Sequence, residues 1–109
     1  MRTWEVSFWD EKVEKQALSM PKGIRVRLIK LIEIMEKRGA NLGLPHTRSM
    51  GQGLFEIRVK APEGLGRFFY ATKVGKQIII LHCFIKNTQE TPKHHLDIAR
   101  TRLKQVKYE

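Results

Sequence analysis

Residues 55–86 have the sequence FEIRVKAPEGLGRFFYATKVGKQIIILHCFIK, and this stretch decides the fold. It contains three runs rich in β-branched and aromatic residues, which predict strands over Phe55–Lys60, Arg67–Thr72 and Ile78–Lys86. The connections between the runs contain Pro62-Glu63-Gly64 and Gly75-Lys76, which are typical of turns. We therefore expect an antiparallel meander of three strands with short connections.

Side chains alternate between the two faces of a strand, so each predicted strand has an apolar and a polar face. In the third run the alternation places Cys83 on the apolar face, where we expect it to be a small core residue. In the second run it places Tyr70 on the other face of the strand from Arg67. If the polar faces of the three runs coincide, one open surface carries Arg58, Lys60, Arg67, His82 and Lys86. Such a cationic surface suits a polyanion.

The segment before the meander predicts one further strand and two helices. Thr3–Phe8 is aromatic and β-branched, as a strand requires. Asp10 is placed to cap a short helix that reaches Leu18. Residues 22–38 carry an apolar stripe at helical spacing and stop at Gly39, and residues 39–53, with four glycines, are predicted to form a loop.

The segment after the meander predicts a last helix. Thr91 and Pro92 fit its N-cap and first helical position, and its buried stripe comprises Leu96, Ala99, Leu103 and Val106. Residues 1–109 are therefore expected to form one α+β domain in the order β-α-α-β-β-β-α, with the helices on one face of the sheet. The sequence leaves open whether the last helix covers the basic surface or packs behind it.

The composition restricts the class of partner. Lys and Arg number 21 against 11 Asp and Glu, and the formal net charge of +10 points to a phosphate-rich partner or to an acidic protein. The lone cysteine, the absence of a signal peptide and the absence of any run of about 20 apolar residues predict a soluble, cytoplasmic protein.

The four histidines do not have the spacing of a metal site. His94 and His95 are adjacent on a predicted helix and cannot share a face, and His82 has no second ligand at a suitable distance along its strand. We therefore expect neither a metal nor a cofactor.

The basic surface instead has the chemistry for cleaving RNA without a metal. That reaction needs a base for the ribose 2′-hydroxyl, cations for the charge that develops on phosphorus, and an acid for the leaving 5′-oxygen. Arg58, Arg67, Lys86 and His82 can supply these groups, with His82 as a proton-transfer group because an imidazole titrates near neutrality. The alternative is an ordinary solvated sheet face, in which His82 hydrogen-bonds within the sheet.

Further residues are expected to contact RNA. Lys60 shares the basic face, Arg48 lies in the preceding loop, and Phe84 could stack on a base together with Phe69. The two phenylalanines could equally rest under the last helix.

Four sequence blocks carry a resemblance to a known family. They are Gly53-Leu54-Phe55-Glu56-Ile57-Arg58, Arg67-Phe68-Phe69-Tyr70, the run from Leu81 to Pro92, and Ala99-Arg100-Thr101-Arg102. Together they resemble, in order and spacing, the phage-derived Gp49-like, HigB-type branch of the RelE (RelE/ParE) toxin superfamily. The resemblance implies a RelE-like fold and a type II toxin, an endoribonuclease that cuts mRNA in the ribosomal A site.

The resemblance also implies site residues and partners. It gives Arg58 and Arg67 the scissile phosphate, and Lys86 is the first lysine of a Phe-x-Lys-Lys-Thr block whose second lysine is replaced here by Asn87. The implied partners are mRNA, the ribosome and a small antitoxin of helix-turn-helix type. The toxin and the antitoxin would form a hetero-oligomer. Because Asn87 removes a cation, the alternative is a non-catalytic relative with a degraded active site that binds RNA, the ribosome or the antitoxin.

Overall fold

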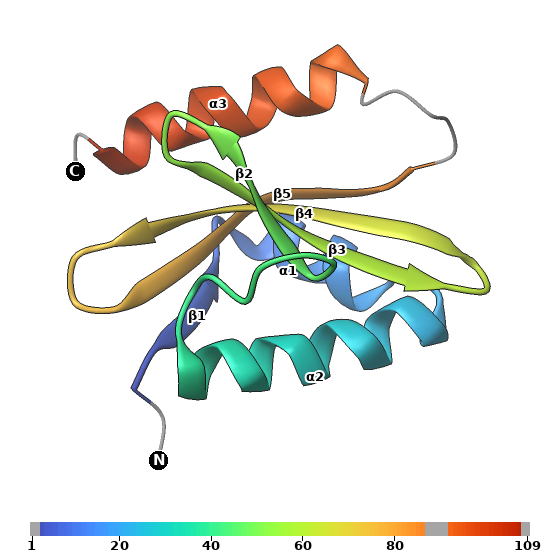
Figure 1. Ribbon diagram of the computed structural model, residues 1–109. Helices are drawn as coiled ribbons and strands as arrows, with labels where there is room; N and C mark the ends of the chain where they lie inside the picture. Colours follow the sequence, from blue (N-terminus) through green and yellow to red (C-terminus); the bar gives the residue numbers. More distant parts are fainter. Residues whose placement is uncertain (1–2, 87–91, 108–109) are drawn as a thin grey trace.

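The computed structural model describes residues 3–86 and 92–107. These residues form one sheet and three helices, in agreement with the predicted α+β class (Figure 1). The elements in chain order are β1 (Glu5–Phe8), α1 (Glu11–Leu18), α2 (Lys22–Arg38), β2 (Thr47–Gly51), β3 (Leu54–Ala61), β4 (Gly64–Lys73), β5 (Gln77–Lys86) and α3 (Lys93–Lys107).

The sheet has five strands in the order β1-β5-β4-β3-β2. The predicted meander forms its centre, because β3, β4 and β5 pair as consecutive antiparallel neighbours. The sheet is mixed rather than wholly antiparallel, since β1 pairs with β5 in parallel, with Glu5 opposite Gln77. The predicted order of elements holds, with β2 as an addition.

The prediction that the helices share one face of the sheet is wrong. Helices α1 and α2 cover one face, whereas α3 crosses the other (Figure 1). Each face therefore has its own core, one centred on Ile24, Leu28 and Phe68 and the other on Phe69 and Leu103. Two cores explain why β4 is apolar on both faces, which is typical of a strand that is covered on both sides.

Helices α1 and α2 form where the sequence predicts them. The backbone N–H of Val13 donates to the Asp10 carboxylate at 2.9 Å, which confirms the N-cap of α1. Helix α2 ends at Gly39, whose φ of +112° is readily adopted only by glycine. The buried stripe of α2 comprises Ile24, Leu28, Leu31 and Met35, as its spacing predicts.

The prediction that residues 39–53 are wholly loop is wrong. Residues Thr47–Gly51 form β2, which pairs with β3 so that Arg48 lies opposite Glu56. The strand is short and polar and lies at the edge of the sheet, where alternation of apolar residues is not required. Its formation places Arg48 on the sheet rather than in a mobile connection.

A β-bulge interrupts the alternation of β5. Phe69 lies opposite His82 and Tyr70 opposite Ile80, so Leu81 is the extra residue. As a result Leu81 packs in the core under α3 although its neighbour His82 lies on that same face. Cys83 lies in the core under α1 and α2, as predicted.

Helix α3 is held on the sheet by apolar contacts and by two arginines. Ala99, Leu103 and Val106 are buried and Leu96 is half-buried, in agreement with the predicted stripe. The predicted N-cap Thr91 lies outside the described residues.

No helix in the described part of the chain is long and apolar enough to cross a membrane.

Candidate active site

The register of the sheet brings the predicted arginines together. Arg58 on β3 lies directly opposite Arg67 on β4, which in turn lies opposite Phe84 on β5. One step along the sheet, Glu56, Phe69 and His82 form a second row across the same three strands. Both rows face α3, so the last helix covers the predicted basic surface.

A buried carboxylate lies at the centre of the arginines. Glu56 is 0% exposed, and its Oε1 accepts a hydrogen bond from Nε of Arg48 at 2.8 Å. Oε1 also lies 3.6 Å from Nε of Arg58, and Oε2 pairs with the guanidinium of Arg67. Burying a carboxylate is costly unless cations and hydrogen bonds replace the lost water, and here three guanidinium groups do so.

Arg67 is as buried as its partner. Its side chain is 1% exposed, and its guanidinium lies 5.4 Å and 5.5 Å from the ring centroids of Phe69 and Phe84. Burial lowers the pKa of Arg67, and the charge of Glu56 opposes that shift. In this arrangement Arg67 does not reach solvent, so any direct contact with a phosphate requires α3 to separate from the sheet.

Arg58 occupies a different environment. Its side chain is 34% exposed, so part of it reaches solvent while Nε lies against Glu56. Its backbone N–H donates to the carbonyl of His46 at 2.8 Å, which ties this part of β3 to the segment before β2. Arg58 is therefore both held in place and accessible, as a residue that binds a phosphate must be.

His82 does not have the properties expected of it. Its ring is 8% exposed, and Nε2 lies 2.7 Å from Nδ1 of His95 on α3. Burial, followed by the nearby charges of His95 and Arg102, lowers the pKa of His82 to about 4. The premise that this imidazole titrates near neutrality is wrong, and the geometry favours a structural hydrogen bond, made to α3 rather than within the sheet.

Phe84 is also placed differently from the prediction that it stacks on RNA. It is 5% exposed, and its ring stacks on that of His95 with centroids 3.9 Å apart and an interplanar angle of 4°. Phe69 is 0% exposed beside it. Of the alternatives left open by the sequence, the structure shows both phenylalanines resting under the last helix.

The remaining predicted residues lie toward the periphery. Lys60 is exposed near the end of β3, and Lys86 is half-buried at the end of β5, opposite Leu65. Arg48, 40% exposed, adds an accessible cation beside Arg58. Asn87 lies outside the described residues.

Glu56 is a site residue that the sequence alone does not reveal. Its place two residues before Arg58, on the same face of the strand, is the one signal in the sequence. Its pairing with Arg48 depends on β2, which the sequence predicts to be a loop. Nothing in the alternation pattern indicated that Glu56 would be buried.

The Ala99-Arg100-Thr101-Arg102 block attaches α3 to the sheet. Ala99 is 0% exposed at the contact between α3 and the sheet. Arg100 donates to the carbonyl of Met50 at 2.9 Å, and Arg102 donates to the carbonyl of Leu81 at 2.6 Å. The two arginines thus fasten α3 across the site.

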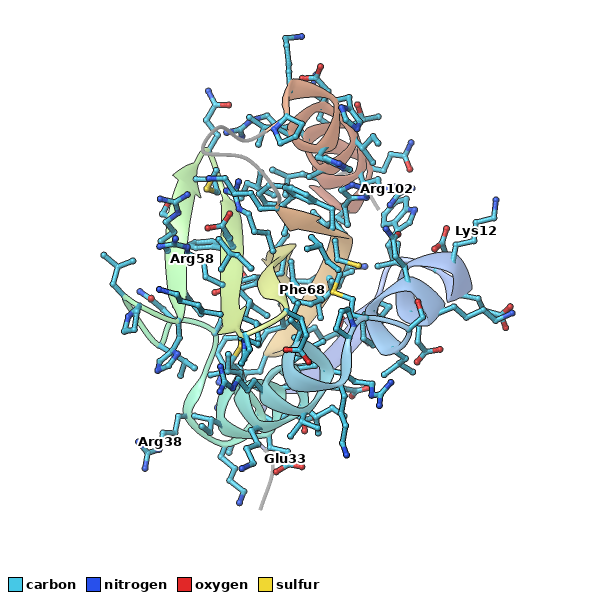
Figure 2. All side chains as sticks on the ribbon, turned by 90° about the vertical axis from the view of Figure 1, so that its right-hand side faces the viewer. Lys12, Glu33, Arg38, Arg58, Phe68 and Arg102 are labelled. Atoms are coloured by element: carbon cyan, nitrogen blue, oxygen red, sulfur yellow. The ribbon has the colours of Figure 1, made fainter. Side chains whose placement is uncertain are left out.

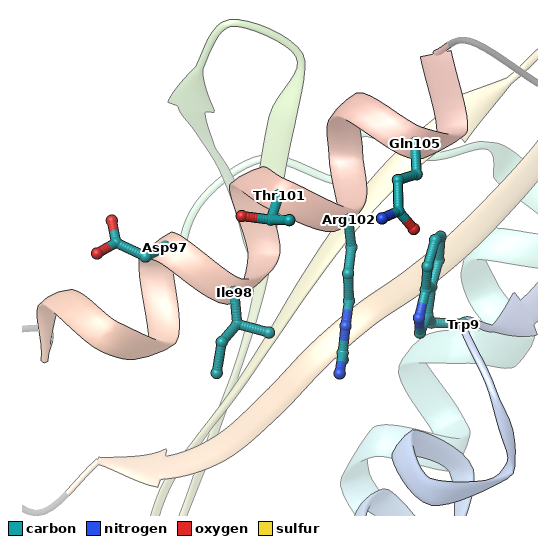
Figure 3. A pocket seen from close by; sticks show the side chains of 6 residues that line it. All are labelled: Trp9, Asp97, Ile98, Thr101, Arg102 and Gln105. Carbon is teal, nitrogen blue, oxygen red and sulfur yellow. The ribbon is translucent and has the colours of Figure 1, made fainter.

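Arg102 also lines a pocket between α3 and Trp9. Figure 3 shows its guanidinium beside Trp9, and the two are 5.9 Å apart by the ring centroid. The other lining residues are Asp97, Ile98, Thr101 and Gln105. This pocket is separate from the Glu56 cluster.

Within residues 3–86 and 92–107, no group of three or more His, Cys, Asp or Glu residues could hold a metal ion.

Comparison with known proteins gives a family and a fold. The model of a family described as phage-derived Gp49-like proteins matches residues 15–104. A chain of the archaeal RelE–RelB complex from Pyrococcus horikoshii OT3 is similar, with 23% identity, a TM-score of 0.53 and coverage of 78% of this chain and 97% of that chain.

A mutant of the E. coli toxin RelE in the free state is also similar, with 12% identity and a TM-score of 0.53 over 97% of this chain and 99% of that chain. At these identities the likeness establishes the fold. No curated protein sequence matches the chain significantly.

Proposed function

The chain belongs to the phage-derived Gp49-like family and has the fold of RelE, and from this premise we propose that it is the toxin of a type II toxin–antitoxin system. In this proposal the protein cleaves mRNA in the cytoplasm, on the ribosome and without a metal. A small antitoxin of helix-turn-helix type neutralises it in a hetero-oligomer. A protein partner is supported by one structural relative, which is a chain of a RelE–RelB complex.

The observation that carries the proposal is the accessible Arg58 held against the buried Glu56. Nε of Arg58 lies 3.6 Å from Oε1 of Glu56, an ion-pair contact without a hydrogen bond, while the side chain remains 34% exposed. A guanidinium that is positioned in advance binds a phosphate without first losing conformational freedom. Arg58 is therefore assigned the scissile phosphate, and Arg48 and Lys60 the neighbouring backbone phosphates.

The proposed reaction is transesterification within the RNA. The ribose 2′-oxygen passes its proton to solvent water and attacks the adjacent phosphorus, the bond from phosphorus to the 5′-oxygen breaks, and the leaving oxygen takes up a proton from water. The products are a 2′,3′-cyclic phosphate and a 5′-hydroxyl. Arg58 and Lys86 stabilise the negative charge that develops on the phosphoryl oxygens.

Arg67 and His82 do not contact the phosphate in this mechanism while α3 covers them. Arg67 neutralises Glu56, so that the carboxylate does not repel the incoming phosphate. His82 is neutral at pH 7 because its pKa is about 4, and it can exchange protons with RNA only when α3 has separated from the sheet. Asn87 contributes a hydrogen-bonding side chain in place of a cation.

The decisive experiment is induced expression of the chain with and without an adjacent antitoxin gene, followed by mapping of mRNA 5′ ends. New 5′ ends on translated messages and growth arrest are expected for the natural chain, and both should be lost in Arg58→Ala. Arg38→Ala, an exposed arginine at the end of α2, is the matched control and should leave cleavage intact. Unchanged cleavage by Arg58→Ala would show that Arg58 does not bind the scissile phosphate.

One observation favours a second function. His82 and Arg67 are covered by α3, so the proton-transfer group that the sequence predicts does not reach solvent in this arrangement. A non-catalytic relative that binds RNA, the ribosome or the antitoxin is consistent with this arrangement. Retained binding to ribosomes with no new mRNA ends would support that function, and Asn87→Lys would then be expected to restore cleavage.

A further inference from the structure

A groove lies beside the candidate site, between α2, β3 and the segment that precedes β2. Its volume is about 400 Å³, and its floor consists of Leu31, Pro45 and Val59. Leu31 is 8% exposed and Val59 1%, so the floor is the outer surface of the core under α2. An apolar floor of this kind binds aliphatic side chains rather than ions.

The rim of the groove is cationic. Arg27 and Lys30 line it from α2, and Arg58 and Lys60 line it from the edge of β3, with the guanidinium of Arg58 directed to Glu56 on the other face of the sheet. No acidic residue in the described part of the chain lines the groove. The nearest carboxylate with an interaction to Arg27 is that of Glu63, which accepts a hydrogen bond from the backbone N–H of Gly23. The groove therefore has an excess of positive charge around an apolar centre.

The edge of β3 is uncovered next to this groove. Strand β2 pairs with β3 only as far as Ile57, and the last bond on that side joins the N–H of Arg58 to His46. Beyond it, the carbonyl of Lys60 accepts from the guanidinium of Arg27. No strand in the described part of the chain lies beside residues 58–61 on this edge. An extended peptide placed here would direct alternate side chains to the floor and to the rim.

We propose that this groove binds an extended acidic segment of a partner protein, in which apolar side chains alternate with carboxylates. The apolar side chains would contact Leu31 and Val59, and the carboxylates would pair with Arg27, Lys30 and Lys60. The inference rests on the proposed function in one respect, since it takes the partner to be the antitoxin. The segment would also run beside Arg58 at the edge of β3, so its binding would restrict the access of RNA to that residue without moving α3.

Two other occupants fit the groove less well. RNA offers phosphates for the rim but no aliphatic groups for the floor, and among the described lining residues the imidazole of His46 is the one aromatic ring on which a base could stack. A second copy of this chain would bring a further formal charge of +10 to a cationic rim. An acidic segment with apolar side chains matches both parts of the groove.

The test is affinity selection of 12-residue peptides from a random displayed library against the full chain, followed by fluorescence anisotropy with the selected peptides. We expect the selected sequences to be acidic and apolar in alternation. Arg27→Glu with Lys30→Glu should weaken their binding by about tenfold or more, because both attractive pairs become repulsive. Lys12→Glu, on the opposite side of the molecule from Arg58, is the control and should leave binding unchanged (Figure 2).

Several outcomes would overturn the proposal. They are selection of peptides without acidic residues, failure to select any peptide, and equal binding by the charge-reversed variant whose circular dichroism matches that of the natural chain. If the same two substitutions weaken the binding of a 12-nucleotide RNA, the groove binds RNA. If the chain self-associates in sedimentation experiments and the same two substitutions abolish that association, the groove binds a second copy. Because peptide binding is measured without RNA cleavage, its result stands apart from the result for the proposed enzyme.

Discussion

Glu56 and Arg67 form an ion pair in which the side chains are 0% and 1% exposed, at the contact between the sheet and α3. The pair is enclosed by Phe69 and Phe84, so neither charge can regain water while α3 is in place. The candidate site thus depends on a contact that is structural as well as electrostatic. Removing Glu56 leaves the charge of Arg67 buried without its carboxylate, whereas removing Arg67 leaves Glu56 with Arg48 and Arg58.

Glu56→Gln should therefore destabilise the protein. The substitution keeps the shape of the side chain but removes the charge that offsets Arg67, and breaking a buried pair in this way costs about 3–5 kcal/mol. Urea denaturation followed by circular dichroism measures the free energy of unfolding. Asp97→Asn is the control, because the Lys93–Asp97 pair is exposed and its loss should cost less than about 0.5 kcal/mol. Similar small effects of the two substitutions would contradict the importance of the Glu56 pair.

Stability should decline in mild acid because of His82. The unfolded chain protonates this histidine near its ordinary pKa of 6.5, whereas the folded chain does so only near pH 4. The contribution of neutral His82 is therefore fully present above pH 6.5 and is lost as the pH falls toward 4, by up to about 3 kcal/mol. Denaturation midpoints between pH 7 and pH 4 measure the slope.

His82→Phe should flatten that slope, since the ring can remain buried without a proton to bind. His46→Gln is the matched control, because His46 is exposed, and it should leave the slope unchanged. Equal slopes in the natural chain and in His82→Phe would show that another group causes the acid sensitivity.

Arg102→Ala should loosen α3 without unfolding the sheet. The substitution removes the hydrogen bond to the Leu81 carbonyl and the contact with Trp9, at a cost of about 1–3 kcal/mol because the donor is charged. Hydrogen exchange should accelerate in α3 and remain slow in β3 and β4. Lys104→Ala, an exposed position on the same helix, is the control. Uniform acceleration in all elements would mean that α3 does not open separately.

Gly66→Ala should overpack the core under α2. A Cβ atom at this position would lie 2.7 Å from Cγ2 of Ile24 and 3.0 Å from Cε1 of Phe68. Because these atoms belong to buried side chains, the expected cost is about 1–3 kcal/mol. Combining Gly66→Ala with Ile24→Ala should cost less than the sum of the single substitutions, since the second removes the clashing group. Strict additivity in urea denaturation would contradict the proposed clash.

Much of the scaffold follows from local sequence patterns. The periodicity of residues 22–38 predicts α2 because a helix with one buried face needs apolar residues at that spacing. The turns at Pro62-Glu63-Gly64 and Gly75-Lys76 predict the meander for the same kind of local reason. These features depend on neighbours within a few residues, so a single sequence contains them.

The departures depend on contacts between distant segments. Residues Thr47–Gly51 become a strand only because β3 offers an edge to which Arg48 can pair through Glu56. The bulge at Leu81 shifts the alternation of β5 by one residue, and no glycine or proline marks it. The position of α3 over Arg67 and His82 likewise depends on the core between Phe69 and Leu103. These relations decide how much of the predicted basic surface reaches solvent.

The parallel pairing of β1 with β5 has a consequence for the time at which the sheet can form during synthesis of the chain. Glu5 pairs with Gln77, so the first strand waits for a partner that is translated 72 residues later. At roughly 5–20 residues per second this delay is about 4–14 seconds. Residues of the candidate site enter the chain late as well, with Arg67 and His82 close to this point and α3 after it. A nascent chain therefore carries Arg58 before it can enclose Glu56, and the site is finished only after α3 has been translated.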